Sequence, residues 1–87
     1  MDEFAVDPVE LTRVVLAVDG VETVKRVRSR WLGNHRAVDM VVTVDAALTL
    51  AASHEIADAI ETSVEQRFGI QDISIHVEPF NQAIRRG

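Results

Sequence analysis

The residues best suited to chemistry in this chain are histidines that stand at short spacing from carboxylates. His76 and Glu78 are two residues apart in an alternating stretch, so that on a strand both side chains project from one face, within reach of a common ion. His54 and Asp58 are four residues apart, one turn of a helix, and could share a metal ion or a hydrogen bond. Imidazole combined with carboxylate suits zinc and the later first-row divalent ions. The spacing therefore indicates divalent-metal sites, although a solvated strand or helix face would carry the same residues.

A further carboxylate and a further histidine lie outside these two pairs. Asp39 joins His76 and Glu78 if its strand neighbours theirs in the sheet, or if a partner chain supplies it. His35 falls in a predicted hairpin turn, where a polar turn residue is a simpler interpretation than a metal ligand. From the residues alone, the role of Asp39 depends on the sheet order.

The composition excludes several other kinds of site. Cysteine is absent, which rules out disulfides, thiolate metal ligands and cysteine nucleophiles, so that a metal would be held by His, Asp and Glu. Those ligands discriminate poorly among zinc, nickel, iron and manganese. The adjacent Ser53 and His54 point apart on a helix, and no nucleophile stands with a base, so we do not expect an enzyme.

The size, charge and hydropathy of the chain limit its partners. With 87 residues it is one small domain, of marginal stability alone, so that a dimer interface would stabilise it. A net charge of −5 argues against nucleic acid, and a single Trp without Tyr lacks the aromatic platform of an RNA-binding sheet. No apolar run approaches the ~18 residues of a membrane span, and the N-terminus has no signal-peptide character. We expect a cytoplasmic protein without direct membrane insertion.

Two amphipathic helices are predicted from apolar spacing and from their caps. The first begins at Asp7, with Pro8 at the first helical position, and ends at Gly20 as a left-handed C-terminal cap. The second begins at Thr49 and ends at Gly69 in the same way. Its buried side consists of Ala52, Ile56, Ile60, Val64 and Phe68.

Alternating residues predict strands at about 24–31, 36–44 and 72–78, the last stopped by Pro79. Gly33 and Asn34 provide a tight hairpin turn between the first two strands. In the first strand one face carries Val27, Ser29 and Trp31, and the other carries Arg26, Arg28 and Arg30. We expect Trp31 in the core or at an interface, because its large apolar side chain is costly to leave in water.

The element order α-β-β-α-β predicts an α+β fold. This is a ferredoxin-like two-layer sandwich with a three-stranded sheet and two helices on one face. The domain is expected to span residues 7–80, between a disordered lead-in of residues 1–6 and a flexible tail of residues 81–87.

Five short segments, none specific alone, together carry a family resemblance. In order they are Val18-Asp19-Gly20-Val21, Arg26-Val27-Arg28, Ala37-Val38-Asp39-Met40, His54-Glu55-Ile56-Ala57-Asp58 and His76-Val77-Glu78-Pro79. Over residues 8–79 the order resembles the C-terminal cytoplasmic domain of cation diffusion facilitator (CDF) metal transporters. The resemblance implies a V-shaped homodimer that closes on binding divalent metal. By position it implies Asp39 and His76 as ligands in the cleft between subunits. Glu78 would be an acidic co-ligand there, and His54 a peripheral ligand.

The function implied by this resemblance is that of a divalent-metal-binding regulatory and dimerisation domain without the transmembrane transport part. Zinc is the expected ion, and iron, manganese, nickel or cadmium are compatible. The expected partners are a second copy of the chain and a membrane cation transporter. The alternative is a metal-independent homodimeric interaction or docking domain of the same fold. An amino-acid-binding regulatory domain is a rival class, but the four glycines stand at caps or turns rather than in a glycine-rich interface segment.

The predicted hairpin is distinctly basic, since it contains Lys25, Arg26, Arg28, Arg30 and Arg36. One interpretation is contact with an acidic partner surface or with phospholipid headgroups. The other is a solvated strand face, balanced by the acidic second helix.

Overall fold

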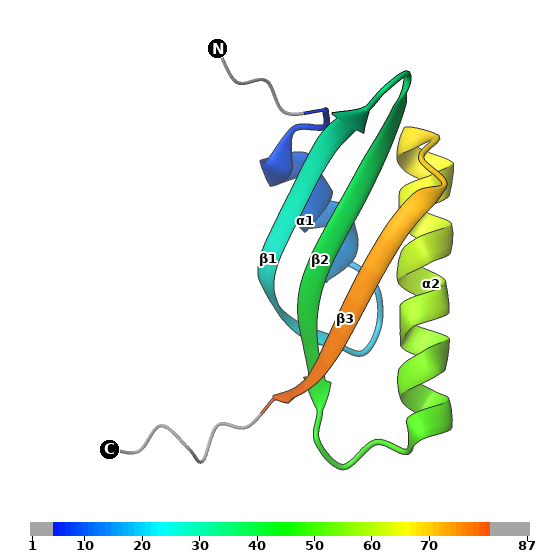
Figure 1. Ribbon diagram of the computed structural model, residues 1–87. Helices are drawn as coiled ribbons and strands as arrows, with labels where there is room; N and C mark the ends of the chain where they lie inside the picture. The colour runs from blue at the N-terminus through cyan, green and yellow to red at the C-terminus, as the bar shows by residue number, and fades with distance from the viewer. Residues whose placement is uncertain (1–4, 81–87) are drawn as a thin grey trace.

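The computed structural model describes residues 5–80, which form five elements in the predicted order. These are α1 (Pro8–Leu16), β1 (Val21–Leu32), β2 (His35–Asp45), α2 (Leu50–Phe68) and β3 (Asp72–Phe80). The two helices pack against one face of a three-stranded sheet (Figure 1), and the predicted α+β fold is confirmed. The expected lead-in over residues 1–4 and the expected tail over residues 81–87 lie outside the described residues.

The sheet has the order β1-β2-β3, with β2 in the centre. β1 and β2 run antiparallel because a two-residue turn joins them, in which Gly33 has a φ of +65°. β2 and β3 run parallel because α2 carries the chain back to the same end of the sheet. Since β2 has a neighbour on each side, its residues are the most buried of the three strands.

The core lies between the sheet and the helices and consists of aliphatic side chains at the predicted positions. From β2 it receives Val38, Met40 and Val42, each at most 2% exposed. From the helices it receives Leu11, Val15, Ile60 and Val64. The edge strands add half-buried side chains: Val24, Val27, Ile73, Ile75 and Val77. Because apolar burial is the main favourable term in folding, we expect this domain to fold without a bound ion.

Three of the four predicted helix caps are confirmed. Asp7 Oδ1 accepts a hydrogen bond from the N–H of Val9 at 2.9 Å and begins α1. Thr49 Oγ1 accepts from the N–H of Ala52 at 3.0 Å and begins α2. Gly69, with a φ of +73°, ends α2 in the left-handed conformation.

The prediction that Gly20 caps α1 was wrong. The helix ends at Leu16 with Ala17 as a right-handed cap, and Gly20 lies in the turn that enters β1, with a φ of +99°. A Cβ at Gly20 would lie 2.5 Å from Ile56 Cδ1 on α2. Glycine is therefore needed there both by the backbone conformation and by the close approach of the second helix.

The folded unit extends further than predicted at several points. β1 begins at Val21 rather than near residue 24, and β3 continues through Pro79 to Phe80. Pro79 is tolerated because β3 is an edge strand, where one side of the backbone has no ladder partner. Val6, assigned to the lead-in by its position, is 6% exposed and donates its N–H to Ser29 Oγ at 2.9 Å. It packs with the domain.

The two helices differ in length, with nine residues in α1 and 19 in α2. Neither combines the length and the apolar composition that crossing a bilayer requires, and residues 5–80 contain no other helix.

Candidate functional site

The candidate site is formed by outward-facing residues on the open face of the sheet. In the parallel pair of β2 and β3, Val41 stands opposite His76 and Thr43 stands opposite Glu78. Asp39 lies two residues before Val41, so it projects on the same side and stands diagonally from His76. The sequence left open whether the strand of Asp39 neighbours the strand of His76 and Glu78. In the structure the two strands are neighbours. Asp39, His76 and Glu78 line one shallow hollow.

The two carboxylates of this hollow are already paired with basic side chains of β1. Arg28 Nε lies 3.5 Å from Asp39 Oδ1, directly across the antiparallel pair. Lys25 Nζ lies 2.9 Å from Glu78 Oε1 and reaches over β2 to the far edge strand. Both ion pairs are partly exposed, so each is expected to stabilise the fold only slightly.

A β-bulge positions Lys25. Val24 stands opposite Val42 and Arg26 stands opposite Val41, so that Lys25 has no partner in the ladder. An extra residue of this kind bends its strand and changes the direction of its side chain. The resulting ion pair was not predicted from the sequence, because a bulge interrupts the alternation from which side-chain directions are predicted.

The surroundings of Glu78 favour its charged form. The hydrogen bond from Lys25 is the main cause that holds the pKa of Glu78 below its ordinary value of 4.5. Partial burial opposes this effect, whereas the positive charges of Lys25 and His76 add to it. His76 Nε2 lies 3.4 Å from Glu78 Oε2, and the side chain of His76 is 68% exposed. The imidazole is thus accessible from solvent.

His54 lies on the exposed side of α2, in its first turns, rather than on the open face of the sheet. A groove between the start of α2 and β3 is lined by His54, His76 and Asp45 among others. Asp58 is exposed one helical turn beyond His54. The structure therefore places the two predicted metal sites beside the same edge strand, with His76 between them.

His35 is the first residue of β2 and lies beside the hairpin turn. Its Nε2 is 3.0 Å from Asp72 Oδ2 at the start of β3. This position agrees with the interpretation of His35 as a polar residue of the turn region.

The donor types of the open face fit a divalent ion, but the described part of one protomer does not gather a complete set of ligands. Within residues 5–80, no three side chains of His, Cys, Asp or Glu lie close enough together to hold an ion. Asp39, His76 and Glu78 offer two carboxylates and an imidazole, but the three groups do not converge on one point, so ligands from a second copy of the chain would be needed to complete the coordination. A cation would also have to exchange with the guanidinium of Arg28 and the ammonium of Lys25.

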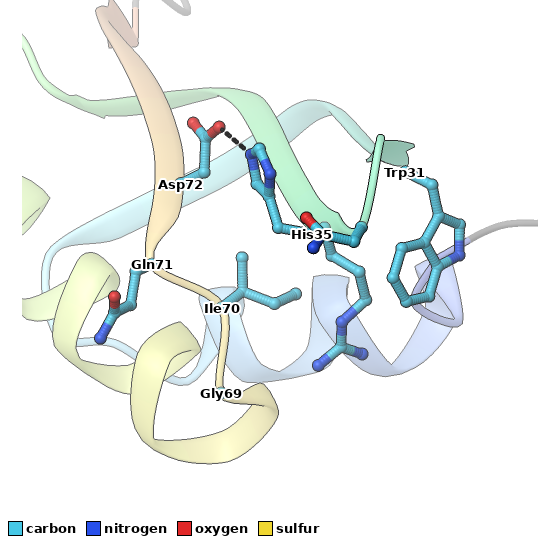
Figure 2. A pocket seen from close by; sticks show the side chains of 8 residues that line it. Trp31, His35, Gly69, Ile70, Gln71 and Asp72 are labelled. Carbon is cyan, nitrogen blue, oxygen red and sulfur yellow. Dashed lines mark hydrogen bonds and ion pairs between the residues drawn. The ribbon is translucent and has the colours of Figure 1, made fainter.

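Of the two positions expected for Trp31, the core and an interface, the structure excludes the core. Trp31 is 56% exposed at the end of β1, and Arg36 Cζ lies 5.9 Å from the centre of its ring. Arg36 Nη2 also donates to the carbonyl oxygen of Phe68 at 2.5 Å, which links the hairpin to the end of α2. Figure 2 shows Trp31 at the side of the hollow between these two elements.

The fold and the open face define a class of small α-β-β-α-β domains that present imidazole and carboxylate groups from a sheet. The chain belongs to the family of cytoplasmic domains of cation efflux proteins, whose family model matches residues 6–80. The resemblance to CDF transporters is thereby confirmed. This family is a group of transporter domains and not a known class of enzymes.

Individual relatives and solved structures agree with this assignment. MneS, a manganese efflux system protein of Bacillus subtilis (strain 168), is 37% identical over 65 residues, which are 75% of this chain and 22% of MneS. A nickel form of an Asp-to-Asn variant of the MamM C-terminal domain has a TM-score of 0.75 and 25% identity, over 82% of this chain and 91% of that chain. A cadmium form of a His-to-Asp variant of that domain has a TM-score of 0.75 and 26% identity, over 82% of this chain and 89% of that chain. The chain spans 21–28% of the length of the curated relatives it matches.

Proposed function

We propose that this chain is a divalent-metal-binding regulatory and dimerisation domain of the CDF type, which acts in the cytoplasm. The observation that carries the proposal is the placement of Asp39, His76 and Glu78 around one hollow on the open sheet face. The nickel and cadmium forms of two variants of the similar MamM domain support a divalent ion as the ligand. The proposed role is regulation by a bound ion rather than catalysis.

His76 is the principal ligand in this proposal, and Asp39 and Glu78 assist. The imidazole is the most exposed of the three groups, with 68% of its side chain in solvent against 28% for Asp39 and 35% for Glu78. Among residues 5–80 it also has no Lys or Arg partner to release, whereas each carboxylate has one. Zinc suits this set of donors, and manganese, iron, nickel and cadmium suit it as well because such ligands discriminate weakly.

The proposed assembly is a homodimer. Residues 5–80 of one protomer supply an incomplete set of ligands, so an ion held between two open faces would link two copies of the chain. The name of the matching family model, ZT_dimer, supports this arrangement. Binding would then favour the arrangement in which the two copies lie closer together, which is how an ion concentration becomes a regulatory signal. The further partner is a membrane cation transporter, and no nucleic acid is involved.

Thermal melting with and without divalent ions tests the metal site. A ligand that binds only the folded state raises its stability by RT ln(1 + [L]/Kd), about 2.7 kcal/mol at a hundredfold excess over Kd. Zinc should therefore raise the Tm of the wild-type chain, and a chelator should reverse the change. His76→Ala should lose most of this rise. His35→Ala is the matched control, since His35 is also a surface imidazole that lies close to a carboxylate. Equal responses of the wild type and His76→Ala to every divalent ion would overturn the proposal.

His54 is proposed as a ligand of a separate, peripheral site in the groove between α2 and β3. His54→Ala should remove a smaller part of the metal-induced rise in Tm than His76→Ala does. If the double variant His54→Ala/His76→Ala loses no more than His76→Ala alone, then His54 has no role in binding.

The alternative function is a metal-independent dimerisation or docking domain. The observation that favours it is that Lys25 and Arg28 already neutralise Glu78 and Asp39, so these two carboxylates need no ion to balance their charge. A dimer in the presence of chelator, combined with no effect of any divalent ion on Tm, would select this alternative.

A further inference from the structure

The end of the β1–β2 hairpin carries two neighbouring large apolar side chains in contact with solvent. Trp31 is 56% exposed and Leu32 is 41% exposed. Successive residues of a strand point to opposite faces of a sheet, so these two side chains lie on opposite sides of the hairpin. Figure 1 shows this end of the hairpin extending past the last turn of α2. No single layer of the domain can therefore cover both side chains.

Residues 30–36, here called the hairpin tip, are also basic. No acidic residue occurs between Glu22 and Asp39, whereas five Lys and Arg residues do, and two of these five, Arg30 and Arg36, belong to the tip. Arg30 is exposed and takes part in none of the ion pairs found among residues 5–80. In a chain with a net charge of −5, the tip is thus a local region of positive charge beside apolar surface.

The carboxylate beside the tip cancels only part of this charge. Asp72, which lies 3.0 Å from His35, is the acidic residue that lines the hollow at the tip, and its single negative charge stands against the two arginines Arg30 and Arg36. Figure 2 shows this pair on the far side of the hollow from Trp31. Arg36 lies over the Trp31 ring, so the aromatic and cationic groups of the tip are adjacent.

Exposed Trp and Leu side chains beside arginines suit the interfacial region of a lipid bilayer. Trp is favoured at the level of the headgroups, and Arg or Lys near an anionic lipid surface contributes about 1 kcal/mol each. The surface of another protein is a poorer match, because it would cover one side of the hairpin and leave either Trp31 or Leu32 in water. A bilayer surrounds both.

We infer that the hairpin tip docks peripherally on a bilayer that contains anionic phospholipid. Trp31 and Leu32 lie at the level of the headgroups, and Arg30 lies beside the phosphates. This contact requires neither a metal ion nor a dimer, and it is therefore independent of the proposed function. It would orient the domain against a membrane without crossing it.

The single Trp of the chain makes the test specific, because all indole emission comes from the hairpin tip. The full chain is mixed with vesicles of phosphatidylglycerol and phosphatidylcholine, or of phosphatidylcholine alone. With the anionic vesicles, the Trp31 emission should shift to shorter wavelength and be quenched by brominated acyl chains. Both changes should be lost at ~1 M salt, where exposed charges are screened beyond about 3 Å. Phosphatidylcholine alone should produce little change.

Variants in the tip separate specific docking from general charge attraction. Arg30→Ser should weaken vesicle binding about fivefold, which is the factor that corresponds to ~1 kcal/mol. Leu32→Ser should weaken binding by at least about threefold, because less apolar surface leaves water. Arg13→Ser on α1 is the control, since Arg13 is an exposed arginine outside the tip, and it should bind as the wild type does.

Three outcomes would overturn the inference. The first is an unchanged Trp31 emission with anionic vesicles. The second is equal weakening by Arg30→Ser and Arg13→Ser, which would indicate attraction by overall charge. The third is salt-sensitive binding to polyglutamate without binding to vesicles, which would assign the tip to an acidic protein surface. Circular dichroism of each variant confirms that the fold is retained.

Discussion

Lys25 Nζ on β1 lies 2.9 Å from Glu78 Oε1 on β3, so a cation from one edge strand neutralises a carboxylate on the other. The contact passes over β2 because a bulge in β1 releases Lys25 from the regular ladder. Together with the pair between Arg28 and Asp39, it supplies the open face with two cations from the chain itself. An added divalent ion would compete with them for the same oxygen atoms.

The Lys25–Glu78 pair should make the stability of the fold depend on pH. Because the folded state lowers the pKa of Glu78, its charged form stabilises the fold above the ordinary value of 4.5. This contribution is lost as the pH falls through the lowered pKa. Lys25→Gln should therefore have a lower Tm than the wild type at neutral pH, and the difference should vanish in strong acid. Melting curves followed by circular dichroism across this range measure the difference. Arg30→Gln is the control, because it removes an arginine that has no ion pair within residues 5–80. Its Tm difference from the wild type should not depend on pH in this way.

Removing Arg28 should strengthen metal binding. Without its guanidinium, Asp39 no longer has to exchange a partner before it binds an ion, and the exposed ion pair is worth about 0.2–1 kcal/mol. Arg28→Gln should therefore lower the apparent Kd for zinc up to about fivefold, as measured by isothermal titration calorimetry at low salt. Arg30→Gln on the same strand removes an equal charge without freeing a carboxylate. Equal effects of the two variants would mean that only the overall charge matters.

Substitution at Gly20 should destabilise the fold more than the same substitution at Gly33. Both glycines have positive φ, so alanine introduces strain of about 1–2 kcal/mol at either position. At Gly20 the new Cβ also meets Ile56 Cδ1 at 2.5 Å, whereas at Gly33 it meets nothing within 4 Å. Overpacking should add about 1–3 kcal/mol at Gly20. Urea unfolding measures the difference, and Ile56→Val, which lacks Cδ1, should recover part of the loss in Gly20→Ala. Similar losses at the two glycines would exclude a role for this contact.

Sedimentation equilibrium tests the assembly of the chain. A homodimer should give twice the chain mass of 9.6 kDa at micromolar concentration, and divalent ions should strengthen the association. His76→Ala should retain the fold but lose the part of the association that depends on divalent ions. A monomer mass with and without ions would contradict both the dimer and an ion held between two copies.

The local features of the fold could be predicted because each depends on a few adjacent residues. The caps at Asp7, Thr49 and Gly69 follow from side-chain or backbone chemistry within one helical turn. The hairpin follows from Gly33 and Asn34, between two alternating stretches. The inward faces of the strands follow from alternation of residue types, and the buried residues of β2 confirm them.

The errors concern residues whose environment is built by distant parts of the chain. Gly20 looks like a helix cap in the sequence, but its contact with Ile56 depends on how α2 packs against the turn. Trp31 has a large apolar side chain of the kind expected in a core or at an interface, yet it is 56% exposed at the end of β1, so the core alternative does not hold. Pro79 was expected to stop β3, but the outer side of an edge strand needs no ladder partner there.

For the candidate site, the sequence by itself determined that His76 and Glu78 share one face of a strand, because that spacing depends only on the geometry of an extended backbone. It also determined that any metal ligands are imidazole and carboxylate groups, since no cysteine is present. Only the tertiary structure decided that Asp39 stands diagonally from His76, because this requires α2 to return the chain parallel to β2 in one register. It also decided that Lys25 pairs with Glu78 and Arg28 with Asp39. Such cross-strand partners are set by strand order, register and a bulge rather than by neighbouring residues.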